Sequence, residues 1–279
     1  MMKIIVAYQA TPQGLDALNW GIELALATGA HLNIALVLRR PGSFTVEYPP
    51  TGQVDEALMS QAFQWLKEAL KLVPEEVDCS ACVCAGHTIA EGLIDHAERV
   101  GGDLLVVGGA SSSPLKRHKL GTVADDLLFG SPLPVALIPR GYQRKAITRI
   151  NCAVGTRPGS GSLVRTGFRL ANETRLPLRL VAVLSDGASA QAARENADSI
   201  VQRVVQSGVQ APEDYSTVVG ESTEITAAVE TVGWTDGDVL LVGSSRVEQK
   251  RRVFAGSIVM YILRELSVVP VVVVPRNDN

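Results

Sequence analysis

The sequence predicts an α/β protein made of two tandem, doubly wound domains, each a five-stranded parallel sheet covered by helices. Three observations predict this fold. Apolar runs alternate with segments of helical periodicity, the whole alternation occurs twice, and one glycine-containing loop returns with the same spacing in both halves. We expect the domains to cover residues 1–142 and 143–279, because a polar linker from Gly141 to Lys145 separates the two repeats.

The first half alternates strands and helices from its start. Strands are expected at Lys3–Tyr8, Leu32–Leu38, Val77–Ala85, Asp103–Val107 and Val135–Pro139. Helices are expected from Thr11-Pro12 to Gly29, from about Asp55 to Leu72, and at Ile89–Val100 and Val123–Phe129. The first helix has typical signals at both ends, because Thr11 can serve as N-cap before a proline and Gly29 as C-cap. The second is expected to bury one side, made of Leu58, Ala62, Trp65, Leu66 and Leu70.

The second half repeats this order. Ala7 matches Ala153 at an offset of 146 (153 − 7), and the glycine loops match at 135 (243 − 108). A helix is expected at Ala188–Gln206, directly after the second strand of this half. Since the offset shrinks along the chain, the second half is the shorter copy of one domain.

The two closing strands, Pro134–Arg140 and Pro270–Arg276, carry a prediction about how the domains join. In a doubly wound sheet of this order the fifth strand lies at an edge, where a flat apolar strand invites aggregation. We expect the two closing strands to pair antiparallel about a pseudo-twofold axis, which removes both edges. The alternative is that a helix or another chain covers each edge.

Composition and charge exclude several classes of protein. Hydrophobic residues make up 46% and charged residues 20% of the 279 residues, which is typical of a globular protein. A net charge of −3 gives no reason to expect nucleic acid or an anionic membrane as a partner. Neither the first apolar run nor Val268–Val274 is long enough for a signal peptide or a membrane span, so we expect a cytoplasmic protein.

Two loops of equal spacing are the strongest candidates for a binding site. Each begins with a glycine after an apolar strand and ends in glycine plus a hydroxyl residue, at Gly108 to Thr122 and at Gly243 to Ser257. The outer glycines are 13 residues apart in both (121 − 108 and 256 − 243). A strand, a loop and a hydroxyl-capped helix start together direct backbone N–H groups at one point, which suits an anion such as phosphate. The alternative is helix capping without a ligand.

These loops, the order of elements and the last strands resemble the universal stress protein family in its tandem, Rossmann-like form. Nucleotide-binding members carry Gly, two residues, Gly, nine residues, then Gly and Ser or Thr. The first half has Ser111 at the middle position, between Gly108 and Gly121-Thr122. The second half has Arg246 there, between Gly243 and Gly256-Ser257.

The resemblance implies an adenine nucleotide, ATP or AMP, or a similar phosphorylated ligand. Nucleotide-binding relatives place an Asp at the end of the first strand, where this chain has Gln9 and Gly155. Gln9 retains an acceptor oxygen, so the first half is the better candidate. Its implied site consists of Gln9, the main chain near Val37, Gly108, Ser111, Gly121 and Thr122. The second would use the main chain near Val183 with Gly243, Arg246, Gly256 and Ser257.

We expect a non-catalytic stress-response binding protein, with association into a homodimer left open. A different reading is a ligand-free interaction scaffold whose nucleotide sites have decayed. A third is a weak ATPase, for which only His118 or Asp125 lies close enough in sequence to act as a base. No Walker loop or hydrolase motif occurs.

The cysteines are expected to be small packing residues. Cys79, Cys82 and Cys84 lie within one strand, and neither a second pair nor suitably spaced histidines complete a zinc set. His31 and His96 are interpreted as structural. The sequence therefore predicts neither a metal site nor catalytic residues.

Overall fold

The computed structural model describes residues 1–39, 52–109, 121–155, 160–185, 189–244 and 269–275. The strands of the first half are β1 (Lys3–Ala7), β2 (His31–Arg39), β3 (Cys79–Gly86), β4 (Leu104–Gly108) and β5 (Val135–Ile138). Those of the second half are β6 (Arg149–Ala153), β7 (Leu178–Leu184), β8 (Tyr215–Glu221), β9 (Asp238–Gly243) and β10 (Val271–Val274). The described helices are α1 (Pro12–Thr28), α2 (Gly52–Leu70), α3 (Ile89–Val100), α4 (Thr122–Gly130), α5 (Ser160–Thr174), α6 (Ala190–Gln206) and α7 (Ile225–Glu230).

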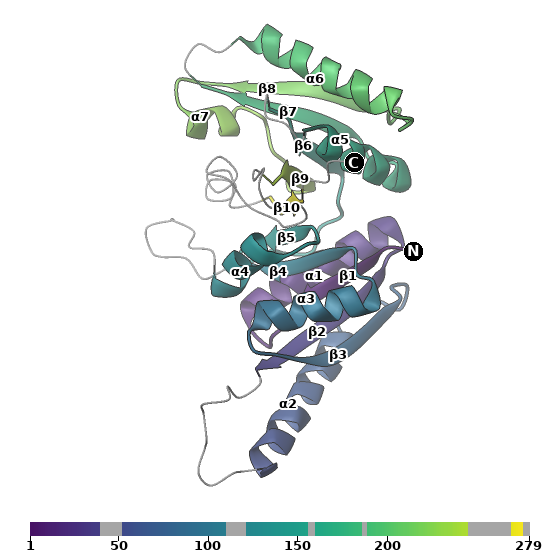
Figure 1. The fold of residues 1–279 in the computed structure, drawn as a ribbon, viewed down its shortest axis with the longest axis vertical. Helices are drawn as coiled ribbons and strands as arrows, with labels where there is room; N and C mark the ends of the chain where they lie inside the picture. The colour runs from purple at the N-terminus through teal and green to yellow at the C-terminus, as the bar shows by residue number, and fades with distance from the viewer. Residues whose placement is uncertain (40–51, 110–120, 156–159, 186–188, 245–268, 276–279) are drawn as a thin grey trace.

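All these strands form one continuous sheet in the order β3-β2-β1-β4-β5-β10-β9-β6-β7-β8 (Figure 1). Neighbours within each half are parallel, whereas β5 and β10 are antiparallel. The predicted pairing of the closing strands is therefore confirmed, and each half contributes the same order of five described strands to one side of that junction. The predicted α/β class with parallel sheets is confirmed as well.

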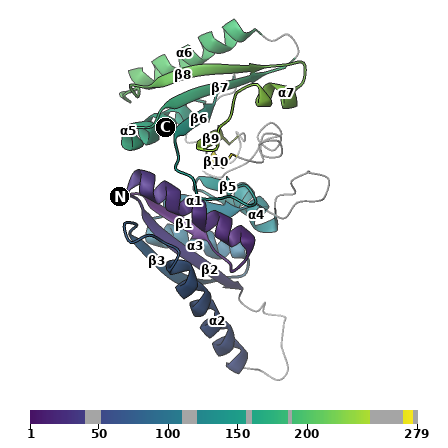
Figure 2. The same cartoon turned by 180° about the vertical axis from the view of Figure 1, so that it is seen from behind.

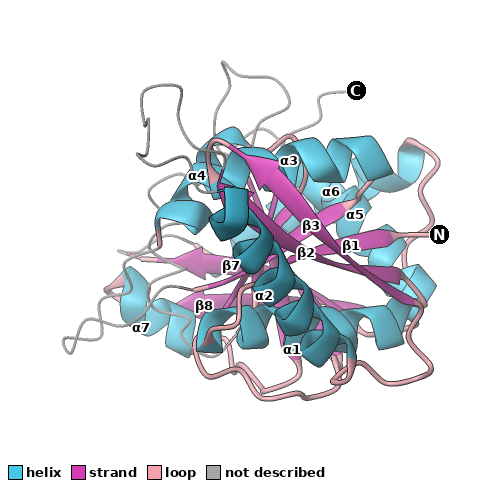
Figure 3. Ribbon diagram, turned by 90° about the horizontal axis from the view of Figure 1, so that it is seen from below, coloured by secondary structure: helices cyan, strands magenta, loops and turns pink. Residues whose placement is uncertain are grey.

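Helices cover both sides of the sheet (Figure 3). One apolar cluster contains buried residues of α1, α2, α5 and α6, and the other contains residues of α3, α4 and α7. There are two clusters because successive side chains along a strand point to opposite faces of the sheet. Each cluster contains residues of both halves, since one continuous sheet runs through the whole structure. The largest fully buried side chains, Trp20 and Phe168, come from α1 and α5 on the same face.

Local signals explain where several helices begin and end. Thr11 caps α1 by accepting a hydrogen bond at 3.2 Å from the Gly14 N–H, and Gly29 ends it in the left-handed conformation at φ 65°. α3 begins with a capping box in which the Thr88 hydroxyl and the Glu91 carboxylate each accept from the other residue's backbone N–H. These ends agree with the sequence predictions.

The buried side predicted for α2 is wrong in part. Ala62 and Leu66 are 0% and 3% exposed, but Leu58, Trp65 and Leu70 are 51%, 40% and 38% exposed. The physical reason is the place of α2 in the fold. It packs against the outer strands β2 and β3, and its N-terminal end extends past the sheet (Figures 1 and 2). A helix packed on one side of an edge buries a narrower stripe than its hydrophobic pattern suggests.

A charged network replaces apolar packing near the start of β6 and β9. Asp238, 2% exposed, accepts hydrogen bonds from Arg149 Nε at 2.6 Å and Arg149 Nη2 at 2.8 Å. Asn151 Nδ2 donates to the same carboxylate at 3.0 Å, and Arg179 lies 3.5 Å from it. Burial raises the pKa of Asp238, but the hydrogen bonds from Arg149, the Thr235 backbone and Asn151 outweigh it and leave the pKa below its usual value.

Candidate functional site

The carboxyl ends of β1, β2 and β4 surround a cavity of about 340 Å³ in the first half, which residues of α1, α3 and the start of α4 also line. Strand order changes direction here, because β1 lies between β2 and β4. Open α/β sheets bind ligands in the crevice formed at such a point. The topology thus creates a concave site where the sequence analysis placed its candidate residues.

The cavity brings together five of the six residues proposed for the first half. Its lining includes Gln9, Val37, Gly108, Gly121 and Thr122. They come from separate segments of the chain, so only the folded sheet brings them together. Ser111, the sixth, lies outside the described residues, as does His118.

Close backbone packing explains the glycine at the end of β4. A Cβ on Gly108 would collide with the backbone oxygen of Gln13, and one on Gly14 would collide with that of Gln9. The end of β4, the start of α1 and the segment after β1 therefore approach one another as bare backbone. Gly108 is needed for this packing whether or not a ligand is present.

The start of α4 differs from the sequence expectation. Gly121 is the N-cap, with extended backbone and no side-chain capping hydrogen bond, and Thr122 is the first helical residue. The predicted cap by the Thr122 hydroxyl is wrong, because a residue inside the first turn cannot cap the helix with its own side chain. The exposed Thr122 hydroxyl and the first N–H groups of α4 are instead left at the cavity, which Gly121 through Ala124 line.

Two lining residues were missed by the sequence analysis. Arg39, the last residue of β2, is exposed and is the charged side chain among the described residues that line the cavity. The sequence feature that could have identified it is a basic residue directly after an apolar strand, at the carboxyl end where parallel strands form binding sites. Tyr8 is 8% exposed, and burial raises the pKa of its phenol, which therefore stays a neutral hydrogen-bond donor.

The corresponding site of the second half is only partly described. Val183 lies in β7 beside β8, and Gly243 ends β9. No atom of the described structure lies within 4 Å of a Cβ built on Gly243, so packing against that part of the chain does not explain this glycine. Arg246, Gly256 and Ser257 lie outside the described residues. Their proposed roles stay predictions.

A second group of polar side chains lies on β3, the outer strand of the first half, and on α3. Cys82 Sγ is 3.5 Å from Cys84 Sγ and 3.3 Å from His96 Nε2. The hydrogen bond from Cys84 lowers the pKa of Cys82 below its ordinary value, and His96 and Arg99 lower it further against the effect of burial. By contrast, burial raises the pKa of Cys79 to about 11. Cys82 and Cys84 pack against the core as expected, but they also face His96. Strand alternation and the facing helix α3 produce this contact, which was not predicted from the sequence.

The family model described as the universal stress protein family matches residues 1–139 and again residues 146–275. The chain belongs to the universal stress protein family. Both halves of the internal repeat are thus copies of the same family domain. The exact boundaries proposed above, at residues 142 and 143, remain a prediction.

Similar curated proteins cover the chain from end to end. A universal stress protein of Mycobacterium tuberculosis strain H37Rv is 28% identical over 98% of this chain and 100% of its own length. The stress response protein NhaX of Bacillus subtilis is 23% identical and covers 49% of this chain with 96% of its own length. The first relative has the tandem length of this universal stress protein, and the second has the length of one half.

Solved structures show the same fold at low sequence identity. A universal stress protein from Archaeoglobus fulgidus matches 99% of this chain and 98% of its own with a TM-score of 0.74 at 16% identity. One from Pseudomonas aeruginosa matches 100% and 94% with a TM-score of 0.60, also at 16% identity. In the described part of this universal stress protein, no helix combines the length and apolar character that a membrane crossing needs.

Proposed function

We propose that the first half binds an adenine nucleotide, ATP or AMP, or a closely similar phosphorylated ligand, and does so without turning it over. The observation that carries the proposal is the cavity that collects Gln9, Val37, Gly108, Gly121 and Thr122 at the carboxyl ends of the strands. Its volume of about 340 Å³ lies within the range of roughly 300–1,000 Å³ typical of small-molecule sites.

The phosphate end of the ligand belongs at the start of α4. A helix start whose N-cap residue makes no side-chain hydrogen bond offers backbone N–H donors and a partial positive charge, which together stabilise an anion. Arg39 supplies a full positive charge to the same cavity, and its planar guanidinium can bind phosphate oxygens in pairs. The two features are independent, since they come from a helix start and from the end of a different strand.

The base end belongs between Gln9 and the main chain near Val37. Val37 is 7% exposed, and with Ala35 and Leu93 it gives this end of the cavity an apolar wall. Gln9 is exposed at the rim, where its amide oxygen can accept from an exocyclic amino group. A neutral amide forms a weaker hydrogen bond than a carboxylate, so we expect modest discrimination between bases.

Binding is tested by the contents of the purified protein and by thermal unfolding. Denatured protein is examined for released nucleotide by chromatography, and melting curves are compared with ATP, AMP and cyclic AMP. A ligand at about 100 times its Kd raises stability by about 2.7 kcal/mol, which gives a clear shift in Tm. Arg39→Ala should reduce the shift for charged nucleotides more than for adenosine, while Arg203→Ala, on the exposed side of α6, should leave it unchanged.

The other two readings give distinct results in the same experiments. No shift with any nucleotide and no released nucleotide would contradict the proposal and favour the interaction scaffold. Phosphate release from ATP that disappears in Asp125→Ala, with nucleotide affinity retained, would instead support a weak ATPase.

A further inference from the structure

Helix α3 covers one face of β2 and β3, and part of that face is polar. The apolar cluster on this face is interrupted by a connected set of side chains: Asn33, Ser80, Cys82, Cys84 and His96. None of these residues lines the nucleotide cavity described above. The set therefore needs an explanation of its own.

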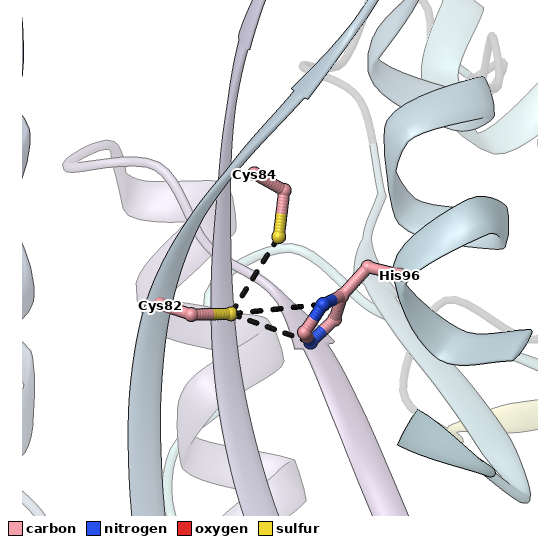
Figure 4. Close-up of side chains that lie close together, drawn as sticks. All are labelled: Cys82, Cys84 and His96. Carbon is pink, nitrogen blue, oxygen red and sulfur yellow. Dashed lines mark hydrogen bonds between the residues drawn. The ribbon is translucent and has the colours of Figure 1, made fainter. Parts of the chain in front are cut away.

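The fold directs three potential metal ligands at one point (Figure 4). Cys82 and Cys84 are two residues apart on β3, so strand alternation places both side chains on the same face. α3 packs over that face and directs the His96 ring toward them. The two Sγ atoms and the imidazole nitrogen lie within 4.8 Å of one another.

The two separations from Cys82 are close to those of a coordination shell. Zinc lies about 2.3 Å from thiolate sulfur and about 2.0–2.1 Å from imidazole nitrogen, so tetrahedral ligands are about 3.8 Å apart for two sulfurs and about 3.6 Å for sulfur and nitrogen. The observed distances are 3.5 Å between the sulfurs and 3.3 Å from Cys82 Sγ to His96 Nε2. Side-chain rotations that open the cluster by a few tenths of an ångström are sufficient to admit an ion.

Surrounding groups orient the His96 ring in the metal-free protein. Asn33 Oδ1 lies 2.8 Å from His96 Nε2, and Asn33 is itself oriented by a 2.8 Å hydrogen bond from its Nδ2 to Ser80 Oγ. Arg99 Nη2 lies 2.9 Å from His96 Nδ1. A guanidinium only donates, so without metal the ring proton is on Nε2. Metal binding at Nε2 takes the place of its hydrogen bond to Asn33 Oδ1. It also moves the ring proton to Nδ1 and displaces Arg99, which is exposed at the end of α3.

Burial of the cluster favours a bound ion and leaves a route to it. Cys84 and His96 are 6% and 5% exposed, so two of the ligands are shielded from competing water. Cys82 is only half-buried and lies on β3, the strand at the edge of the sheet. An ion can therefore enter from the edge.

We propose that Cys82, Cys84 and His96 bind one thiophilic cation, Zn²⁺ or Cu⁺, with any fourth position open to solvent. Two thiolates and one imidazole are ligands that both ions accept. Three protein ligands suit a three-coordinate Cu⁺ as they stand, whereas Zn²⁺ takes a water as its fourth ligand.

The test uses the full chain, reduced and freed of metal by a chelator. Co²⁺ is added as a spectroscopic probe of tetrahedral thiolate coordination, and Zn²⁺ is then titrated against it. Cu⁺ is offered separately in competition with a coloured Cu⁺ chelator. We expect one equivalent of Co²⁺ to give a sulfur-to-cobalt charge-transfer band that Zn²⁺ removes, or one equivalent of Cu⁺ to be retained against the chelator. The first result assigns the site to Zn²⁺ and the second to Cu⁺.

Variants locate the site. Cys82→Ser, Cys84→Ser and His96→Gln should each weaken binding by at least about 100-fold, since loss of even an outer-shell partner costs about 10–100-fold. Cys79→Ser is the matched control, because Cys79 lies on the same strand but packs against the opposite face. Cys152→Ser is the control in the second half.

A measurement on the unaltered protein keeps the test independent of variant folding. Bound metal should protect Cys82 and Cys84 from alkylation, read by mass spectrometry, without changing the rate at Cys79. Absence of both the cobalt band and Cu⁺ retention in the reduced, folded protein would overturn the proposal. So would binding that all three ligand variants retain, or protection of Cys79 to the same degree as Cys82.

Discussion

Val272 of β10 faces Ala136 of β5 across the antiparallel pair that joins the two halves of the chain. Both are buried, at 6% and 0% exposed, and each belongs to a strand whose other neighbour is parallel. This pair joins the described strands of the two halves into one sheet and buries the apolar edges that each half would otherwise expose.

Val272→Asp should destabilise the whole chain, because it places an unpaired carboxylate in the apolar core on one face of the sheet. Val272→Ala should cost about 1–3 kcal/mol by loss of packing alone. Urea unfolding measures both. Val205→Ala is the matched control, since Val205 is 44% exposed on α6 and its change should stay within about 0.5 kcal/mol. Equal effects at positions 205 and 272 would contradict the importance of the junction.

Asp238→Ala should cost about 3–5 kcal/mol, because it leaves Arg149 and the buried Arg179 without their counter-ion. The control is Asp236→Ala. Asp236 pairs with Lys145 in solvent, its side chain is 70% exposed, and its removal should change stability by less than about 1 kcal/mol. Chemical unfolding at neutral pH compares the two.

The same carboxylate predicts a dependence on acid. The pKa of Asp238 is lower in the folded protein than its ordinary value of 3.8, so the unfolded chain binds the proton more tightly. Its contribution to stability is present above 3.8 and is lost as the pH falls through the lower folded value. Asp238→Asn should flatten the stability curve in that acid range and leave it unchanged in shape at neutral pH. If the variant lost stability in acid as steeply as the unaltered protein, Asp238 would not be the source of this pH dependence.

Gly108→Ala should destabilise the first half by about 1–3 kcal/mol and reduce nucleotide affinity, because the added Cβ collides with the Gln13 backbone oxygen. Gly161→Ala, at the start of α5 where a Cβ meets nothing within 4 Å, should be neutral or stabilising by up to about 1 kcal/mol. Thermal unfolding with and without ATP distinguishes the two. If Gly108→Ala were tolerated as well as the α5 change, the close approach would be in doubt.

Leu66→Ala and Trp65→Ala test which side of α2 is buried. Leu66 is 3% exposed, and its truncation should cost about 2–5 kcal/mol. Trp65 is 40% exposed, so removal of the larger side chain should cost less than that of the smaller one. Both losses of stability are measured by urea unfolding. A larger loss for Trp65→Ala than for Leu66→Ala would favour the wider buried face that the sequence periodicity predicted.

Signals that act within one or two turns were readable from the sequence. Thr11 and Gly29 limit α1 as predicted, because caps depend on hydrogen bonds between residues three or four apart. The capping box of Thr88 and Glu91 at the start of α3 is a local signal of the same kind, although it was not used in the sequence prediction. The internal repeat was readable for a similar reason, since it compares the chain with itself. The pairing of β5 with β10 followed from the apolar character of two predicted edges.

Contacts between distant segments were not readable in the same way. Thr122 lies inside α4 rather than capping it, Arg39 lines the cavity from the end of β2, and α2 buries only a stripe. His96 lies 3.3 Å from Cys82 although it is 14 residues away in the chain. The cavity lining, the buried stripe of α2 and the contact of His96 with Cys82 depend on how helices and strands pack together. The start of α4 at Thr122 is a local feature, and the sequence prediction placed it one residue too late.

By itself, the sequence determined the alternation of strands and helices, the doubling of the domain and the segments that carry the candidate site, because periodicity and capping are local properties. Only the tertiary structure decided which side chains meet: the cavity around Gln9 and Thr122, the exposed side of α2, and the cluster of two cysteines and a histidine. The physical reason is that these contacts depend on the packing of helices against one twisted sheet, and this packing is set by the whole core rather than by any single segment.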